Sequence, residues 1–145
     1  MKHKGKSYSF VKQRNDDLYA EYKKIVSKRS FLNMGEIANE LCTIPAPRFY
    51  VSSERAAIVI SAMYNGFKLK GMTKNKKEMF IELYKRAKKL KKKMPDLSWT
   101  EIAQMLVNQP APSFYLTPGS AKVLISHAKR EWFKQRKEKL KHLFF

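Results

Sequence analysis

Hydrophobic residues recur with helical spacing in six segments of the chain. After Asp16, Leu18, Tyr22 and Ile25 follow one another at three- and four-residue steps, which predicts a helix starting near Asp16. Acidic residues at its start would suit the positive end of the helix dipole. The same pattern returns over about 77–93, where lysines fill the positions between the apolar residues. We therefore expect two related amphipathic helices with basic outer faces.

Two shorter helices are predicted over about 34–42 and 99–107. Ser98 and Glu101 fit a capping box, in which the serine and glutamate side chains each satisfy a free backbone N–H group. Asn33 and Glu36 form the weaker counterpart in front of the first short helix.

Each short helix is followed by the tripeptide Pro-Ala-Pro and then by Phe-Tyr. Proline lacks an N–H donor and pushes the preceding residue toward extended geometry, so 45–51 and 110–116 are predicted to be extended connectors. A third helix should run from Ser52 or Ser53 to about Tyr64. Its counterpart should start at Thr117-Pro118 and continue toward the C-terminus, since no breaker follows.

The two halves of the chain are copies of one another at an offset of 65 residues. From Leu18/Leu83 to Ser61/Ser126, 18 of 44 aligned pairs are identical without a gap, where unrelated segments match at roughly one in twenty. Such periodicity implies an internal duplication. It predicts an all-α fold of two tandem three-helix units that resemble the helix-turn-helix. The corresponding segments are a flexible basic arm (1–15), a first repeat (16–65), a mobile basic linker (66–76) and a second repeat with a long basic C-terminal helix (77–145).

Matching apolar positions predict matching packing environments in the two copies. The expected equivalences pair Ile37, Leu41, Phe49 and Ile60 with Ile102, Leu106, Phe114 and Ile125. The Phe-Tyr pairs are expected to pack in the core, although exposed rings could instead stack on bases.

Charge adds the main indication of function. The 145 residues contain 31 Lys and Arg against 12 Asp and Glu, a net charge of +19. Segments 1–30, 66–94 and 128–145 carry +6, +10 and +5, whereas 31–65 and 95–127 carry −1 each. A field of this size attracts polyanions, and nucleic acid is the most abundant of them. The alternative is a soluble protein with solvated, lysine-rich faces.

Candidate nucleic-acid contacts fall on the basic flanks and at the starts of the third helices. Early positions of those helices would face bases if the units bind as helix-turn-helix domains, and Arg55 could pair with guanine. The two copies differ most at these positions, which would follow either from two half-sites of different sequence or from plain surface drift. The candidate residues are Lys2, Lys4, Lys6, Arg48, Ser53, Arg55, Lys91, Lys92, Lys93, Ser120, Lys122, Lys129, Arg130, Lys134, Arg136 and Lys137.

The C-terminal helix is basic and amphipathic, a type that binds nucleic acid, anionic membranes or proteins. Trp132 and Phe133 are expected to pack against the first repeat. The terminal residues Leu143, Phe144 and Phe145 would either fold back on the core or insert into a partner.

Nothing in the sequence predicts catalysis, a metal site or a cofactor. His3, His127 and His142 are scattered, and the single Cys42 excludes a multi-cysteine zinc site. No apolar segment approaches the roughly 20 residues of a membrane span, and no signal peptide is visible. These features predict a soluble, cytoplasmic protein without a membrane partner.

The repeated motif Pro-Ala-Pro-x-Phe-Tyr-[Val/Leu]-[Ser/Thr], over 36–61 and its second copy, resembles small, uncharacterised basic proteins of phages and mobile elements of gut bacteria. The resemblance implies an origin and assigns no functional residue. We expect a non-enzymatic nucleic-acid-binding protein, with DNA favoured over RNA. The alternative is a phage virion or assembly component that binds nucleic acid or other assembly proteins without sequence specificity.

Overall fold

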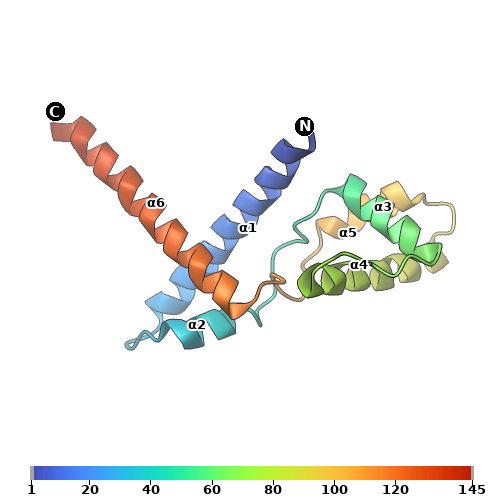
Figure 1. Ribbon diagram of the computed structural model, residues 1–145, viewed down its shortest axis with the longest axis horizontal. Helices are drawn as coiled ribbons and strands as arrows, with labels where there is room; N and C mark the ends of the chain where they lie inside the picture. The colour runs from blue at the N-terminus through green and yellow to red at the C-terminus, as the bar shows by residue number, and fades with distance from the viewer. Residues whose placement is uncertain (1, 145) are drawn as a thin grey trace.

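The computed structural model describes the backbone of residues 2–144 and the side chains of residues 10–143. This part of the chain is all-helical and contains no strand (Figure 1). Its helices are α1 (Lys2–Ser27), α2 (Met34–Leu41), α3 (Ser53–Tyr64), α4 (Lys74–Lys93), α5 (Trp99–Val107) and α6 (Pro118–Phe144).

Side-chain caps set most of the helix starts. Ser98 Oγ accepts a hydrogen bond from the Glu101 N–H (3.2 Å), as the capping box predicts. Asn33, Ser52 and Thr117 cap α2, α3 and α6 in the same way. Thr73 caps α4, which therefore begins at Lys74, three residues before the predicted start.

The predicted flexible arm is wrong, because α1 already begins at Lys2. Residues 2–15 contain no proline, and one glycine costs a helix only about 1 kcal/mol. Asp16 and Asp17 therefore lie in the middle of α1 rather than at its positive end. Asp16 instead pairs with Lys12 one turn earlier (3.0 Å).

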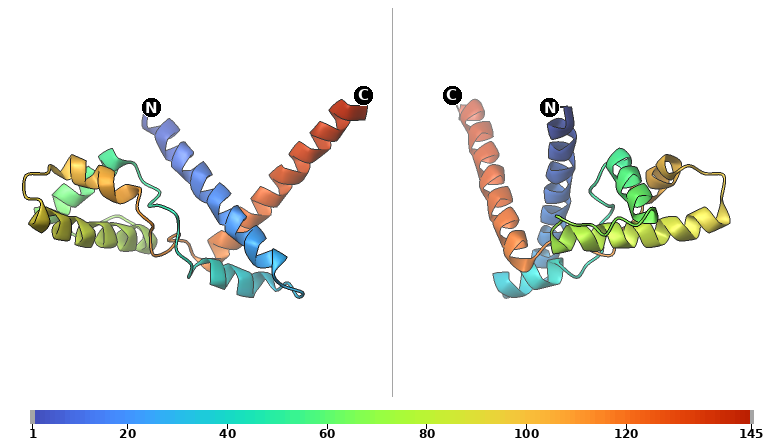
Figure 2. Two further views of the ribbon diagram at one scale, coloured as in Figure 1. Left: turned by 180° about the vertical axis from the view of Figure 1, so that it is seen from behind. Right: turned by 45° about the vertical axis from the view of Figure 1, so that its right-hand side comes forward.

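The helices form two three-helix units that do not coincide with the sequence repeats. α6 packs on α1 and α2, whereas α3 packs on α4 and α5. Figures 1 and 2 show the two units side by side, joined by the connectors. Helices of different units make no contact in the described part of the chain. Each unit thus takes its third helix from the other repeat, and the α3–α4–α5 unit is the continuous segment 53–107 inserted between α2 and α6.

The extended connectors cross each other at the Pro-Ala-Pro tripeptides. The Ala46 N–H donates to the Ala111 carbonyl (3.0 Å), and the Ala111 N–H donates to the Ala46 carbonyl (2.9 Å). This antiparallel bridge is isolated, and one further hydrogen bond, from the Phe49 N–H to the Val107 carbonyl (3.0 Å), follows along the first connector. Both alanines are buried at the crossing.

The residues expected to share environments are all buried. These are Ile37, Leu41, Phe49 and Ile60 in the first repeat and Ile102, Leu106, Phe114 and Ile125 in the second. In each repeat the isoleucine of the third helix is buried in the unit built on the other repeat's first two helices.

The segment between α3 and α4, predicted to be a mobile basic linker, places one side chain in the core. Leu69 is buried, although its φ of 60° is unusual for a residue with a side chain. Gly66 and Gly71 flank it with φ values of 102° and 83°, a region that glycine enters without strain. The glycines therefore serve a tight turn that places Leu69 in the core.

Candidate nucleic-acid interface

The second half of α6 projects beyond the body of the protein. Residues 130–143 are all exposed, because α6 continues past the part that packs on α1 and α2 (Figures 1 and 2). Trp132 and Phe133, expected to pack against the first repeat, are 40% and 63% exposed. Their rings contact each other edge to face instead, with centroids 5.0 Å apart. The prediction of packing is therefore wrong for these two residues.

Four cations follow one side of this projecting segment. Arg130, Lys134, Lys137 and Lys141 are spaced by four, three and four residues, so they lie in a row of about 16 Å. None forms an ion pair within the described part of the chain. We call these four residues the α6 basic row. Their charges are free to meet an external polyanion.

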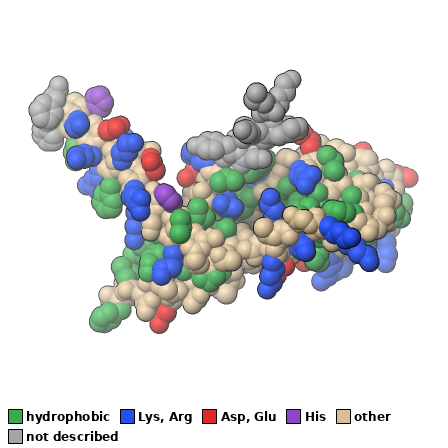
Figure 3. All heavy atoms as spheres, in the orientation of Figure 1, with side chains coloured by type: hydrophobic (Ala, Val, Ile, Leu, Met, Phe, Trp, Pro, Cys, Tyr) green, Lys and Arg blue, Asp and Glu red, His purple; other side chains and the backbone are tan. Residues whose placement is uncertain are grey.

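A second group of exposed cations covers the outer side of α4. Lys85, Lys88, Lys89 and Lys92 are exposed, and Figure 3 shows Lys and Arg side chains over both α4 and α6. Lys88 Nζ lies 5.0 Å from the Tyr84 ring centroid, a cation–π distance. The predicted contacts did not include Lys85, Lys88, Lys89 or Lys141. Their helical spacing could have identified them as members of the same exposed basic faces.

Two of the predicted phosphate contacts are engaged inside the fold. Arg48 Nε donates to the Phe49 carbonyl (2.9 Å), and its guanidinium lies 4.6 Å from the Phe10 ring centroid. Burial lowers the Arg48 pKa. Lys91 Nζ donates to the Leu97 carbonyl and lies over the Trp99 ring. Arg48 and Lys91 are therefore held by contacts within the protein, whereas Lys92 and Lys93 are exposed.

Lys129 and Arg136 also lie against rings. Lys129 Nζ is half-buried, 4.8 Å from the Tyr22 centroid, and Arg136 Cζ is 5.2 Å from the Trp132 centroid. The side chains of Lys2, Lys4 and Lys6 lie outside the described residues, as do those of Phe144 and Phe145. Leu143 is 76% exposed and does not fold back on the core.

The candidate base-contacting residues lie on separate units. Arg55 is exposed at the start of α3, and Ser53 beside it is half-buried. Ser120 and Lys122 are exposed at the start of α6. The fold therefore does not bring the two sets into one cluster, because each set lies at the start of the third helix of a different unit.

The paired aromatic residues pack at the crossing, as expected. Phe49 stacks on Tyr115 and Tyr50 on Phe114, with centroids 6.3 and 5.9 Å apart. Both phenylalanines are buried and both tyrosines half-buried. The Tyr50 hydroxyl donates to Asp17 (2.6 Å). Burial, with that carboxylate, raises the Tyr50 pKa; burial also raises the pKa of Tyr115, to about 12.

Among the described residues, no three His, Cys, Asp or Glu side chains are close enough to hold a metal ion. None of the described helices combines the length and apolarity that crossing a membrane requires. The chain matches no protein-family model, no curated protein and no solved structure.

Proposed function

We propose that this all-helical protein binds nucleic acid without catalysis, and that its main target is duplex DNA. The observation that carries the proposal is the α6 basic row, which stands clear of the body with no carboxylate paired to it in the described chain. Adjacent cations on one side of a helix repel one another, and a bound polyanion would relieve that repulsion. The net charge of +19 and the exposed lysines of α4 add to the same field.

A salt-titrated binding series tests the proposal. Four phosphates neutralised on duplex DNA correspond to a slope of about −3.6 in log K against log salt, and fewer counterions are released from single strands. We expect the salt slope to become shallower by about this amount, on every duplex sequence, in a variant with glutamine at Arg130, Lys134, Lys137 and Lys141. The matched control keeps all four charges by exchanging arginine for lysine and lysine for arginine, and it should bind like the wild type.

Either of two results would contradict the proposal. One is binding that hardly depends on salt; the other is no binding to duplex DNA at low salt. Tighter binding to duplex RNA in the same series would move the target from DNA to RNA.

Base reading by helix-turn-helix-like units is the finer part of the proposal. In this arrangement α3 would be the reading helix of the α3–α4–α5 unit, and exposed Arg55 at its start would contact a base. Selection from random duplexes should then enrich a preferred site. Arg55→Ala should lose about 1–3 kcal/mol on that site, whereas replacing Lys92 and Lys93 should weaken all sequences alike. If no sequence is enriched, binding is by charge alone.

A virion or assembly component of a phage or mobile element is the second candidate. The exposed apolar residues Trp132, Phe133 and Leu143 on the projecting segment favour it, since such residues commonly mark contact surfaces. Absence of binding in the duplex DNA series would favour this candidate function.

A further inference from the structure

The second repeat supplies both of the most basic helices, α4 and α6. Residues 83–93 of α4 contain seven cations and no carboxylate, whereas their repeat counterparts, residues 18–28 of α1, contain three cations and one carboxylate. Among the additional cations, Lys85 and Lys92 replace Ala20 and Ser27. Because α1 is helical over the same positions, a helix with this apolar pattern forms without the additional charge.

Five exposed lysines form what we call the α4 basic cluster. No ion pair involves any of them within the described part of the chain, and the carboxylate nearest in sequence, Glu82, is paired with Arg86 (3.1 Å). Cations in the last turn of a helix also suit the negative end of its dipole, but three of the five lie before that turn. The cluster consists of Lys85, Lys88, Lys89, Lys92 and Lys93.

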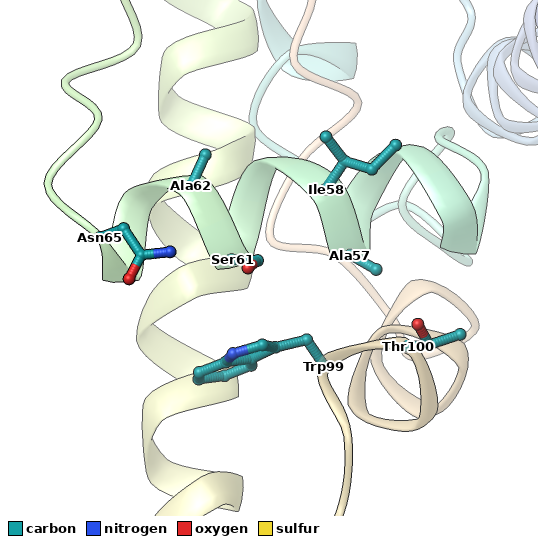
Figure 4. A pocket seen from close by; sticks show the side chains of 7 residues that line it. All are labelled: Ala57, Ile58, Ser61, Ala62, Asn65, Trp99 and Thr100. Atoms are coloured by element: carbon teal, nitrogen blue, oxygen red, sulfur yellow. The ribbon is translucent and has the colours of Figure 1, made fainter.

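The hollow on the α3–α4–α5 unit offers no alternative site for a phosphate. An open groove of about 530 Å³ lies between α3 and the start of α5, where Figure 4 shows Trp99 across from Ser61. None of the residues that line the groove is charged. In this unit the α4 basic cluster is therefore the surface that fits a polyanion.

The exchange of third helices separates the α4 basic cluster from the α6 basic row. A unit built from the second repeat alone would contain both, but α4 packs on α3 and α5, while α6 packs on α1 and α2. The end of α4 and the end of α6 consequently lie toward opposite ends of the longest axis of the molecule (Figure 1). The connectors between the units belong to segments 31–65 and 95–127, which carry −1 each. Each unit thus has one basic surface of its own.

We propose that the α4 basic cluster is a second phosphate-binding surface, and that one protein molecule holds two DNA duplexes, one on each unit. The proposal rests on the duplex binding proposed above and adds that the two surfaces act separately. Contacts to phosphates alone carry no sequence requirement. The resulting activity is the bridging of two DNA segments, or the looping of one molecule when both segments belong to it.

Capture of a second duplex measures bridging. One duplex of about 30 base pairs, roughly 100 Å long, is fixed to beads, and an unrelated fluorescent duplex of the same length is added with the protein. Each duplex is longer than α4 and α6 end to end, about 70 Å, so one duplex has the length to cover both surfaces if they face it together. At about 0.15 M salt, the wild type should capture the second duplex. With duplex in excess, sedimentation velocity should show two duplexes on one protein.

Two variants with the same loss of charge locate the second surface. The α4 variant removes three lysines of the cluster, through Lys88→Gln, Lys89→Gln and Lys93→Gln. The matched control removes their exposed repeat counterparts on α1, through Lys23→Gln, Lys24→Gln and Lys28→Gln. Capture by the α4 variant should fall about tenfold or more, because three phosphate contacts are lost at the second surface. The control should capture like the wild type, and far-UV circular dichroism checks that both variants are folded.

Mixing variants gives the decisive result. The α4 variant and the glutamine variant of the α6 basic row each keep one surface, so their mixture should not restore capture. Restored capture would mean that bridging runs through protein–protein contacts, which overturns the proposal. It is equally overturned by one duplex per protein at duplex excess, or by a control that loses capture as the α4 variant does. Fluorescence anisotropy with a single duplex separates the two proposals: binding without bridging overturns only this inference, whereas no binding overturns the proposed function as well.

Discussion

At the residue scale, the two repeats make similar ring contacts at the crossing of the connectors but differ in their hydrogen bonds. Tyr50 and Tyr115 are repeat counterparts, and each stacks on the phenylalanine of the other connector. Asp17 and Glu82 are also counterparts. Only Tyr50 donates a hydrogen bond to its carboxylate; the Tyr115 hydroxyl makes none within the described residues. One tyrosine therefore ties its connector to α1, while the other contributes through packing.

We expect Tyr50→Phe to lower the free energy of unfolding by about 1–2 kcal/mol. A hydrogen bond to a charged group contributes about 1.5–3 kcal/mol, and this one is only partly buried. Tyr115→Phe is the matched control and should change stability by less than about 0.5 kcal/mol. Urea denaturation of the three proteins measures the difference, and equal losses in both variants would show that the Asp17 bond adds nothing.

At the element scale, local sequence signals determine where the helices begin and end, but they do not determine which helices pack together. The caps at Asn33, Ser52 and Ser98 were readable because their side chains satisfy nearby N–H groups. The packing partner of each third helix could not be predicted from the sequence. Since Ala56 and Ile60 of α3 recur as Ala121 and Ile125 of α6, the apolar pattern does not say which unit each helix packs on, and the extended connectors reach across to the other repeat.

The exchange of third helices predicts crossed effects of core mutations. Ile60→Ala in α3 should cost about 2–5 kcal/mol and speed amide hydrogen exchange in α4 and α5. Ile125→Ala in α6 should cost a similar amount but speed exchange in α1 and α2. Hydrogen exchange read by mass spectrometry separates these peptides. Increased exchange of α1 and α2 in Ile60→Ala would indicate that each repeat forms its own unit.

At the scale of the whole molecule, one unit is local in sequence and the other is not. The α3–α4–α5 unit is the continuous segment 53–107, whereas α6 must return across that segment to reach α1 and α2. Closing a longer loop costs more entropy, and non-local contacts form more slowly. The helices of the two units do not touch in the described chain, so they are not obliged to form together.

We therefore expect α3, α4 and α5 to become protected before α1, α2 and α6 during refolding. Pulse-labelling hydrogen exchange after dilution from denaturant measures the order directly. Simultaneous protection of all helices would show instead that the connector crossing, through Ala46 and Ala111, couples the two units from the start.

The sequence by itself determined the all-helical class, the starts of α2, α3, α5 and α6, and the burial of residues such as Ile37 and Ile102. Those features depend on apolar spacing, caps and prolines, which act within a few residues. Tertiary structure alone decided that third helices are exchanged, that Arg48 is engaged by backbone carbonyls and that the end of α6 stands free. Each of these depends on which surfaces meet, and two repeats with the same apolar pattern leave that choice open until the chain has packed.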